Sequence, residues 1–184
     1  MGDSTNQALK PFLVVMGVAG CGKSSLGVAL ARSLDVPLIE GDDFHSPANR
    51  EKMRQGIALT DADRAGWLDA LAEQMLRHPW GGVLTCSALK RRYRDRLRAA
   101  RADVHFVFLD ITVELAEARV AARTSHFFST ALVASQFATL ESPIREPGVL
   151  ALDASLPARA LLERVNAWVA TAAAARENSS KIPS

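Results

Sequence analysis

The sequence contains few of the residues that mark secreted, metal-binding or membrane proteins. It has two cysteines, Cys21 and Cys86, and they lack the paired spacing of a metal site. No apolar run is long enough to span a membrane, and Met1–Lys10 is polar where a signal peptide is hydrophobic. We therefore expect reduced thiols, no membrane partner and a cytoplasmic location.

The sequence also lacks a large excess of charge of one sign. The 184 residues carry a net charge of +2, and the basic residues are scattered except in the run Lys90–Arg98. This balance argues against a nucleic-acid partner. Hydrophobic residues make up 48% of the chain and charged residues 23%, as in ordinary globular domains.

The length of the chain supports one domain rather than two. We expect a single α/β domain over residues 11–175, preceded by a flexible lead-in at 1–10. Residues 176–184 have no apolar periodicity, which predicts a disordered tail.

One glycine-rich stretch organises the chain. Phe12–Met16 predicts a strand buried on both faces, and Lys23–Leu34 has apolar residues at helical spacing. Between them the sequence fits G-x-x-x-x-G-K-S, the P-loop, whose backbone N–H groups cradle a polyphosphate. Lys23 would reach the β- and γ-phosphates, and the Ser24 hydroxyl would ligate Mg²⁺. We therefore expect ATP and Mg²⁺ as cofactors, with nucleotide contacts from Gly17, Val18, Ala19, Gly20, Cys21, Gly22, Lys23, Ser24 and Ser25.

The rest of the chain alternates predicted strands and helices, which favours a three-layer fold with five parallel strands between helices. A break in the helical pattern at 125–128 predicts a helical lid over about 119–140. Thr60 and Asp63 predict a capping box at the start of one helix. The further strands are expected at Val36–Glu40, Gly82–Cys86, Val104–Leu109 and Val149–Leu152, and the helices at Pro47–Gln55, Asp61–Arg77, Lys90–Arg98, Val113–Thr124, Ala131–Leu140 and Ala158–Ala175.

Asp42 follows the second predicted strand. The carboxyl ends of parallel strands form the ligand-binding edge of such sheets, so Asp42 is expected to face the phosphate loop. It would orient the attacking hydroxyl and take its proton, although a turn or capping role is also open. The third strand ends in Thr85, Cys86 and Ser87 rather than in an aspartate. The metal would therefore depend on Ser24, phosphate oxygens and water, with Asp42 as an outer partner.

Several cationic side chains are candidates for binding anions. Arg119 and Arg123 lie four residues apart on one predicted helix face, where they could stabilise the transferred phosphoryl group or simply be exposed. The basic run Lys90–Arg98 could attract an anionic substrate or form a solvated face. The predicted catalytic residues are Lys23, Asp42, Arg119 and Arg123, and the predicted substrate-binding residues are Asp42, His45, Arg64, Lys90, Arg94 and His126.

Four stretches resemble the gluconokinase family, P-loop sugar-acid kinases related in architecture to shikimate kinase: GVAGCGKSS, GDDFHSPANREKMRQGIALTDADRAGWL, CSALKRRYRDRLR and HFFSTALVASQFATLESP. The resemblance covers roughly Phe12–Trp168. It implies transfer of the γ-phosphoryl group of ATP to the 6-hydroxyl of D-gluconate, with Mg²⁺, to give 6-phospho-D-gluconate and ADP. It also implies a cytoplasmic homodimer in gluconate catabolism that feeds the pentose phosphate or Entner–Doudoroff routes.

The chain departs from the family pattern at a few positions. Ala58 and Gly66 stand where proline is common, and Ser125 and Ser129 stand where glycine and lysine are common. Ser129 therefore removes one cation that the family pattern places in the lid. The alternative functions are another small-molecule P-loop kinase, such as shikimate kinase, and a nucleotide switch without a chemical step.

Overall fold

The structure, a computed structural model, describes residues 10–122 and 130–179. Its centre is a sheet of five parallel strands in the order β2-β3-β1-β4-β5. The predicted five-stranded parallel sheet between helices is confirmed. The strands are β1 (Phe12–Met16), β2 (Leu38–Glu40), β3 (Gly82–Thr85), β4 (Val104–Asp110) and β5 (Val149–Asp153).

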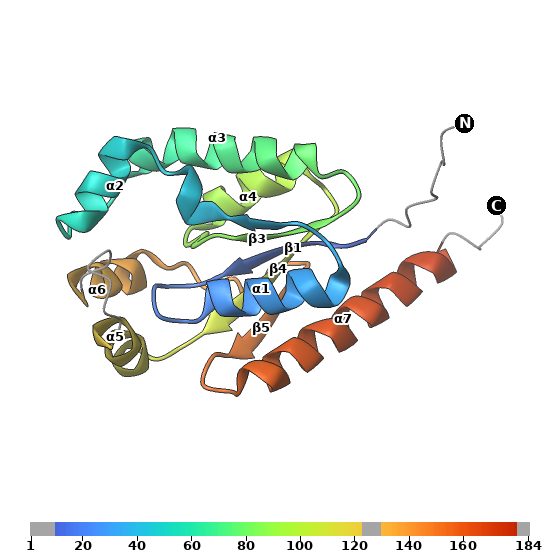
Figure 1. Cartoon of the computed structure of the whole chain (residues 1–184). Helices are drawn as coiled ribbons and strands as arrows, with labels where there is room; N and C mark the ends of the chain where they lie inside the picture. Colours follow the sequence, from blue (N-terminus) through green and yellow to red (C-terminus); the bar gives the residue numbers. More distant parts are fainter. Residues whose placement is uncertain (1–9, 123–129, 180–184) are drawn as a thin grey trace.

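Strand β1 is apolar throughout because both of its faces are covered. Its side chains alternate between two hydrophobic clusters. Leu13 and Val15 pack toward α1 (Lys23–Leu34) and α7 (Ala158–Ser179), on one face of the sheet. The other three residues of the strand pack toward α3 (Asp61–Arg77) and α4 (Arg91–Ala100). These two helix layers enclose the sheet in Figure 1.

The remaining helices gather at the end of the sheet to which the strands point (Figure 1). The 3-10 helix η1 (Gly41–Phe44) and α2 (Pro47–Arg54) follow β2, while α5 (Val113–Ala121) follows β4. Helix α6 (Thr130–Thr139) lies beside α5. The elements that carry the site thus surround the carboxyl ends of the strands, where parallel sheets bind ligands.

Several element boundaries differ from the prediction by one to four residues, and two of these differences have a clear physical reason. Strand β2 begins at Leu38 rather than Val36, because the Val36 N–H donates to the Ala31 carbonyl and closes α1. Helix α7 runs to Ser179, four residues past the expected end at Ala175. The alanine run before that point has high helix propensity and carries the helix onward.

Capping residues set the ends of several helices. Thr60 and Asp63 form the predicted capping box of α3, each bonding the backbone N–H of the other, so this prediction is confirmed.

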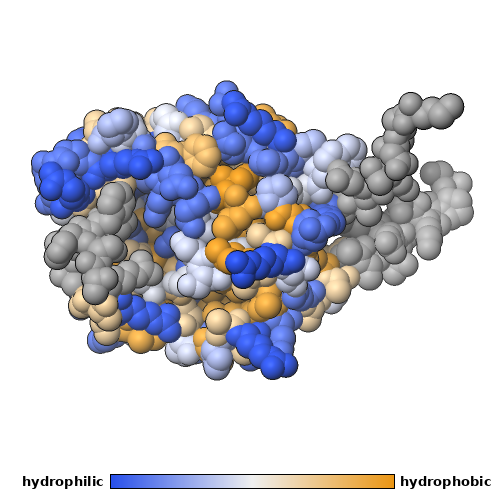
Figure 2. All heavy atoms as spheres, in the orientation of Figure 1, coloured by the Kyte–Doolittle hydropathy of each residue, from blue (hydrophilic) through white to orange (hydrophobic). Residues whose placement is uncertain are grey.

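On the face seen in Figure 2, hydrophilic residues gather over α2, whose sequence is PANREKMR. Across the described part of the chain, none of the helices has the length and apolar character needed to cross a membrane.

Candidate active site

The phosphate loop, which connects β1 to α1, is fixed by close backbone packing against β4 and α5. At Gly17, which has φ +140°, a Cβ would lie 2.8 Å from the Leu109 carbonyl oxygen. At Gly20, which has φ +84°, a Cβ would lie 2.6 Å from the Ala116 carbonyl oxygen of α5. Only glycine tolerates both the positive φ and this close approach. The loop is therefore held rigidly before any ligand binds.

The N-terminus of α1 is available for an anion. No side chain of the described residues caps it, whereas Thr60 caps α3 and Thr112 caps α5. The N–H groups of its first turn and the positive end of its dipole are the usual binding elements for phosphate. The Lys23 ammonium donates to the Val18 carbonyl oxygen at 3.0 Å, so it lies directly over the loop.

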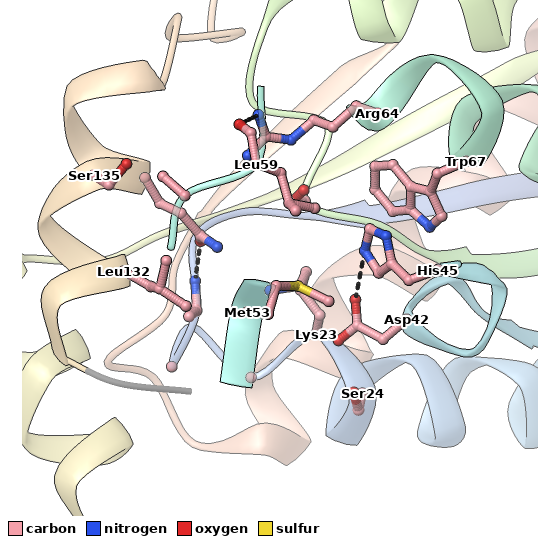
Figure 3. A pocket seen from close by; sticks show the side chains of 16 residues that line it. Lys23, Ser24, Asp42, His45, Met53, Leu59, Arg64, Trp67, Leu132 and Ser135 are labelled. Atoms are coloured by element: carbon pink, nitrogen blue, oxygen red, sulfur yellow. Dashed lines mark hydrogen bonds and ion pairs between the residues drawn. The ribbon is translucent and has the colours of Figure 1, made fainter. Parts of the chain in front are cut away.

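A pocket opens beside this loop and brings together residues that are distant in the sequence (Figure 3). Its lining comes from the phosphate loop and the start of α1, from the segment 42–67, from Ser87 and from α6. Of the nine residues predicted to bind nucleotide, Gly17, Val18, Cys21 and Ser25 do not line it. The lining residues are Ala19, Gly20, Gly22, Lys23, Ser24, Asp42, His45, Met53, Ala58, Leu59, Arg64, Trp67, Ser87, Leu132, Ser135 and Gln136.

Asp42 is positioned by the tight packing of its neighbour. A Cβ at Gly41 would lie 2.1 Å from the Thr85 carbonyl oxygen, so only glycine lets η1 lie against β3. The Trp67 indole N–H donates to the Gly41 carbonyl oxygen at 2.8 Å. These contacts fix the start of η1, and the half-exposed Asp42 carboxylate projects into the same pocket as Lys23. Figure 3 draws both side chains among those that line the pocket.

His45 lies almost fully buried in this pocket, stacked on Trp67. The two rings lie 4.4 Å apart at 13°, and the imidazole Nε2 lies 3.9 Å from an Asp42 oxygen (Figure 3). Within the described chain, the buried Nδ1 atom has no hydrogen-bond partner. Burial lowers the pKa of His45 to about 4; Asp42 opposes this shift, while Arg64 and Arg50 add to it. The ring is therefore neutral near pH 7 and suited to bonding an uncharged hydroxyl.

Arg64 supplies a cation on the wall of the pocket. Its guanidinium donates to the Leu59 carbonyl oxygen and lies 5.8 Å from the centre of the Tyr93 ring. These contacts hold the side chain in place while leaving other donors for an anion.

Arg94 does not belong to this site, which corrects its prediction as a substrate-binding residue. Its side chain is fully buried, and all three guanidinium nitrogens are occupied by the Glu146 carboxylate and by backbone carbonyls. A basic residue with its donors already bonded cannot also bind a substrate carboxylate.

Lys90 also lies outside the pocket lining. Its ammonium pairs with Asp61 at 3.0 Å, and the Asp61 carboxylate also accepts bonds from Tyr93 and Arg92. These donors, Tyr93 first, hold the pKa of Asp61 well below its usual range. The predicted Lys90 contact with substrate is therefore replaced by an ion pair that joins α3 to the loop before α4. Asp63, two residues further along α3, serves the capping box.

Arg119 connects the phosphate loop to the segment that follows β5. It donates to the Ala154 carbonyl oxygen at 3.0 Å and approaches the Gly20 carbonyl oxygen at 3.5 Å. Ala154 directly follows the end of β5. The predicted residues Arg123 and His126 and the expected break in the lid lie outside the described residues.

The pocket offers oxygen ligands suited to a hard cation. The Ser24 hydroxyl and the Asp42 carboxylate both line it, and Mg²⁺ prefers a few such oxygens together with phosphate and water. Within residues 10–122 and 130–179, no group of three or more His, Cys, Asp or Glu side chains could hold a metal by itself. The residues present thus fit a magnesium ion bound mainly through a nucleotide.

Comparison with known proteins agrees with this arrangement. Residues 12–147 match the protein family described as AAA domain. Over 145 residues the chain is 51% identical to the gluconokinase of Gluconobacter oxydans. This alignment covers 76% of this chain and 80% of that protein. This chain belongs to the gluconokinase family. The resemblance inferred from the four sequence stretches is therefore confirmed.

Further gluconokinases share both sequence and structure with the chain. The thermoresistant gluconokinase of Escherichia coli is 40% identical over 148 residues, covering 78% of this chain and 85% of that protein. The crystal structure of a gluconokinase from Sinorhizobium meliloti has a TM-score of 0.86 at 40% identity, covering 94% of this chain and 99% of that one. The P-loop kinase fold is shared by an APS kinase from Mycobacterium tuberculosis, which is 20% identical and has a TM-score of 0.62. The alignment covers 86% of this chain and 96% of that one.

Sequence reasoning missed part of the gluconokinase pocket. It did not select the apolar wall formed by Met53, Leu59 and Leu132, which form one small buried cluster. It also did not select Gln136, whose amide oxygen accepts the Ala19 N–H. Neither feature has a local signal, because each depends on contacts between segments far apart in the chain.

Proposed function

We propose that this protein transfers the γ-phosphoryl group of ATP to the 6-hydroxyl of D-gluconate, giving 6-phospho-D-gluconate and ADP. The observation that carries the proposal is one pocket that joins a P-loop, with Lys23 and Ser24, to Asp42 and the neutral His45. Membership of the gluconokinase family supports the choice of acceptor.

On the donor side, the loop amides, the α1 N-terminus and Lys23 hold the β- and γ-phosphates. Ser24 would hold Mg²⁺, with Asp42 in the same pocket, and the ion would neutralise phosphate charge. Arg119 lies against the loop, and with Arg123 it would stabilise the charge on the transferred group. Phosphoryl transfer needs alignment and charge stabilisation more than covalent chemistry, and these groups supply both.

On the acceptor side, Asp42 orients the 6-hydroxyl and takes its proton. The neutral His45 ring lines the pocket beside Asp42, and its Nε2 atom, which faces Asp42, bonds another hydroxyl of the sugar acid. Arg64 attracts the substrate carboxylate. His126 would join this set from the lid, which we expect to exclude water over about 119–140.

The family resemblance supports further features of the protein. We propose a cytoplasmic homodimer that acts in gluconate catabolism, upstream of the pentose phosphate route. Nucleic acid and membranes are not among the proposed partners.

A coupled assay of ADP release tests the proposal against its alternatives. D-gluconate, shikimate, glycerate and nucleoside monophosphates are supplied in turn with ATP and Mg²⁺. Stimulation by D-gluconate alone is the expected result. Stimulation by shikimate or a nucleoside monophosphate instead would favour another small-molecule kinase, and stimulation by none would favour a nucleotide switch.

A further inference from the structure

One amide of the phosphate loop is already bonded to a side chain from another part of the chain. The Oε1 atom of Gln136 accepts the Ala19 N–H at 2.7 Å, although the two residues are 117 positions apart. Both residues line the pocket that holds Lys23 and Asp42. A side-chain carbonyl thus stands where a loop amide could donate to phosphate.

The helix that carries Gln136 contacts both sides of the pocket. Leu132, one turn earlier on α6, packs with Met53 and Leu59 on the acceptor side. Just beyond α6, the Glu141 N–H donates to the Leu89 carbonyl oxygen at 2.9 Å. Helix α6 therefore connects the phosphate loop to the segment that would hold the acceptor.

The Ala19 N–H cannot donate fully to Gln136 and to a phosphate at the same time. An ionised phosphate oxygen is the stronger acceptor, because charge-assisted hydrogen bonds are roughly twice as strong as neutral ones. Ala19 lines the same pocket as Asp42 and His45 on the acceptor side and as Lys23 and Ser24 at the α1 N-terminus. The terminal phosphate must face the acceptor, so it is the group that competes for this N–H.

We propose that Gln136 is a positioning residue whose amide oxygen exchanges with the γ-phosphate of ATP at the Ala19 N–H. Because ADP has no γ-phosphate, only ATP displaces Gln136 from the Ala19 N–H. Helix α6 carries Gln136 and contacts the acceptor side of the pocket, so the acceptor side responds to ATP and not to ADP. The inference rests on the proposed function in taking ATP as the phosphoryl donor.

Two substitutions at this position have opposite expected effects. Gln136→Met keeps the side-chain length but removes the competing acceptor. Gln136→Glu keeps the acceptor and adds a negative charge beside the γ-phosphate. Thr139→Val is the matched control, because its hydroxyl bonds only the Ser135 carbonyl within α6 and it does not line the pocket.

Calorimetry measures the Kd of a non-hydrolysable ATP analogue and of ADP for each protein. The Met variant should bind the analogue about fivefold more tightly, the effect of one net hydrogen bond. The Glu variant should bind it at least about tenfold more weakly, and ADP affinity should change by less than about twofold in both. The Thr139→Val protein should match the wild type. The Kd of D-gluconate should depend less on which nucleotide is bound in the Met variant than in the wild type.

Other outcomes overturn the inference. Unchanged analogue affinity in both Gln136 variants would show that no exchange occurs. Equal changes in the Kd of the analogue and in the Kd of ADP would show that Gln136 does not compete with the γ-phosphate. Wild-type protein that bound neither nucleotide would overturn the proposed function itself, so the two failures are distinguishable.

Discussion

Removing the Arg94 side chain tests whether this residue belongs to the core or to the substrate site. Its guanidinium is fully buried against Glu146 and three backbone carbonyls. Breaking a buried ion pair by removing one partner costs about 3–5 kcal/mol. At about 2–4 °C of melting temperature for each kcal/mol in a chain of this size, Arg94→Met should melt about 6–20 °C lower.

The matched control is Arg96→Met on the same helix. Arg96 is half-exposed and pairs with Asp69 at the surface, and such pairs contribute at most about 1 kcal/mol. Thermal unfolding followed by circular dichroism compares the two variants, and the KM for D-gluconate is measured on the folded protein. A normal melting temperature with a raised KM in Arg94→Met would refute the structural assignment and return Arg94 to the substrate site.

The pair itself can be isolated by a double-mutant cycle. Glu146→Leu leaves the Arg94 charge buried, although Arg98 also loses its 2.7 Å contact with the same carboxylate. The double variant Arg94→Met/Glu146→Leu removes both charges of the pair, so its loss of stability should be smaller than the sum of the single losses. Additive losses would mean that the two side chains do not interact.

The remaining predictions concern the pocket. Lys23→Ala and Asp42→Asn should each lower kcat by more than about tenfold, equivalent to about 1.4 kcal/mol of barrier, in the coupled assay; smaller losses would contradict their roles. His45→Gln, whose amide lies near the position of Nε2, should raise the KM for D-gluconate less than His45→Asn, whose amide lies near Nδ1; the reverse order would assign the substrate contact to Nδ1. Because the pKa of His45 is about 4 in the folded protein and 6.5 ordinarily, only the unfolded chain binds its proton between these values. The free energy of unfolding should therefore fall as pH drops from about 6.5 to about 4, less steeply in His45→Gln, as urea titrations at several pH values can check.

The parts of the site that follow from local sequence could be predicted. The P-loop is a contiguous motif, and its strand and helix follow from apolar spacing. The position of Asp42 follows from the rule that ligands bind at the carboxyl ends of parallel strands, and the pocket indeed brings it to the loop. The capping box of α3 likewise depends only on residues three positions apart.

The parts that depend on long-range contacts could not be predicted. Arg94 lies in a run of basic residues that suggests a solvated face, and its partner Glu146 is 52 positions away. Arg94 directly follows Tyr93 and lies three residues before Leu97, and both of these side chains are buried. This spacing is the one local indication that Arg94 faces inward. Gln136 has no such signal, because its contact with Ala19 depends on how α6 packs against the loop.

The most direct test of the central claim is the ³¹P NMR spectrum of the product formed from ATP and D-gluconate. Carbon 6 is the only primary alcohol carbon of gluconate, so a phosphate ester there couples to a methylene group. The account predicts a new phosphomonoester triplet that grows as ADP accumulates. A doublet, which indicates an ester on one of the secondary alcohols, or the absence of any phosphomonoester signal would contradict it.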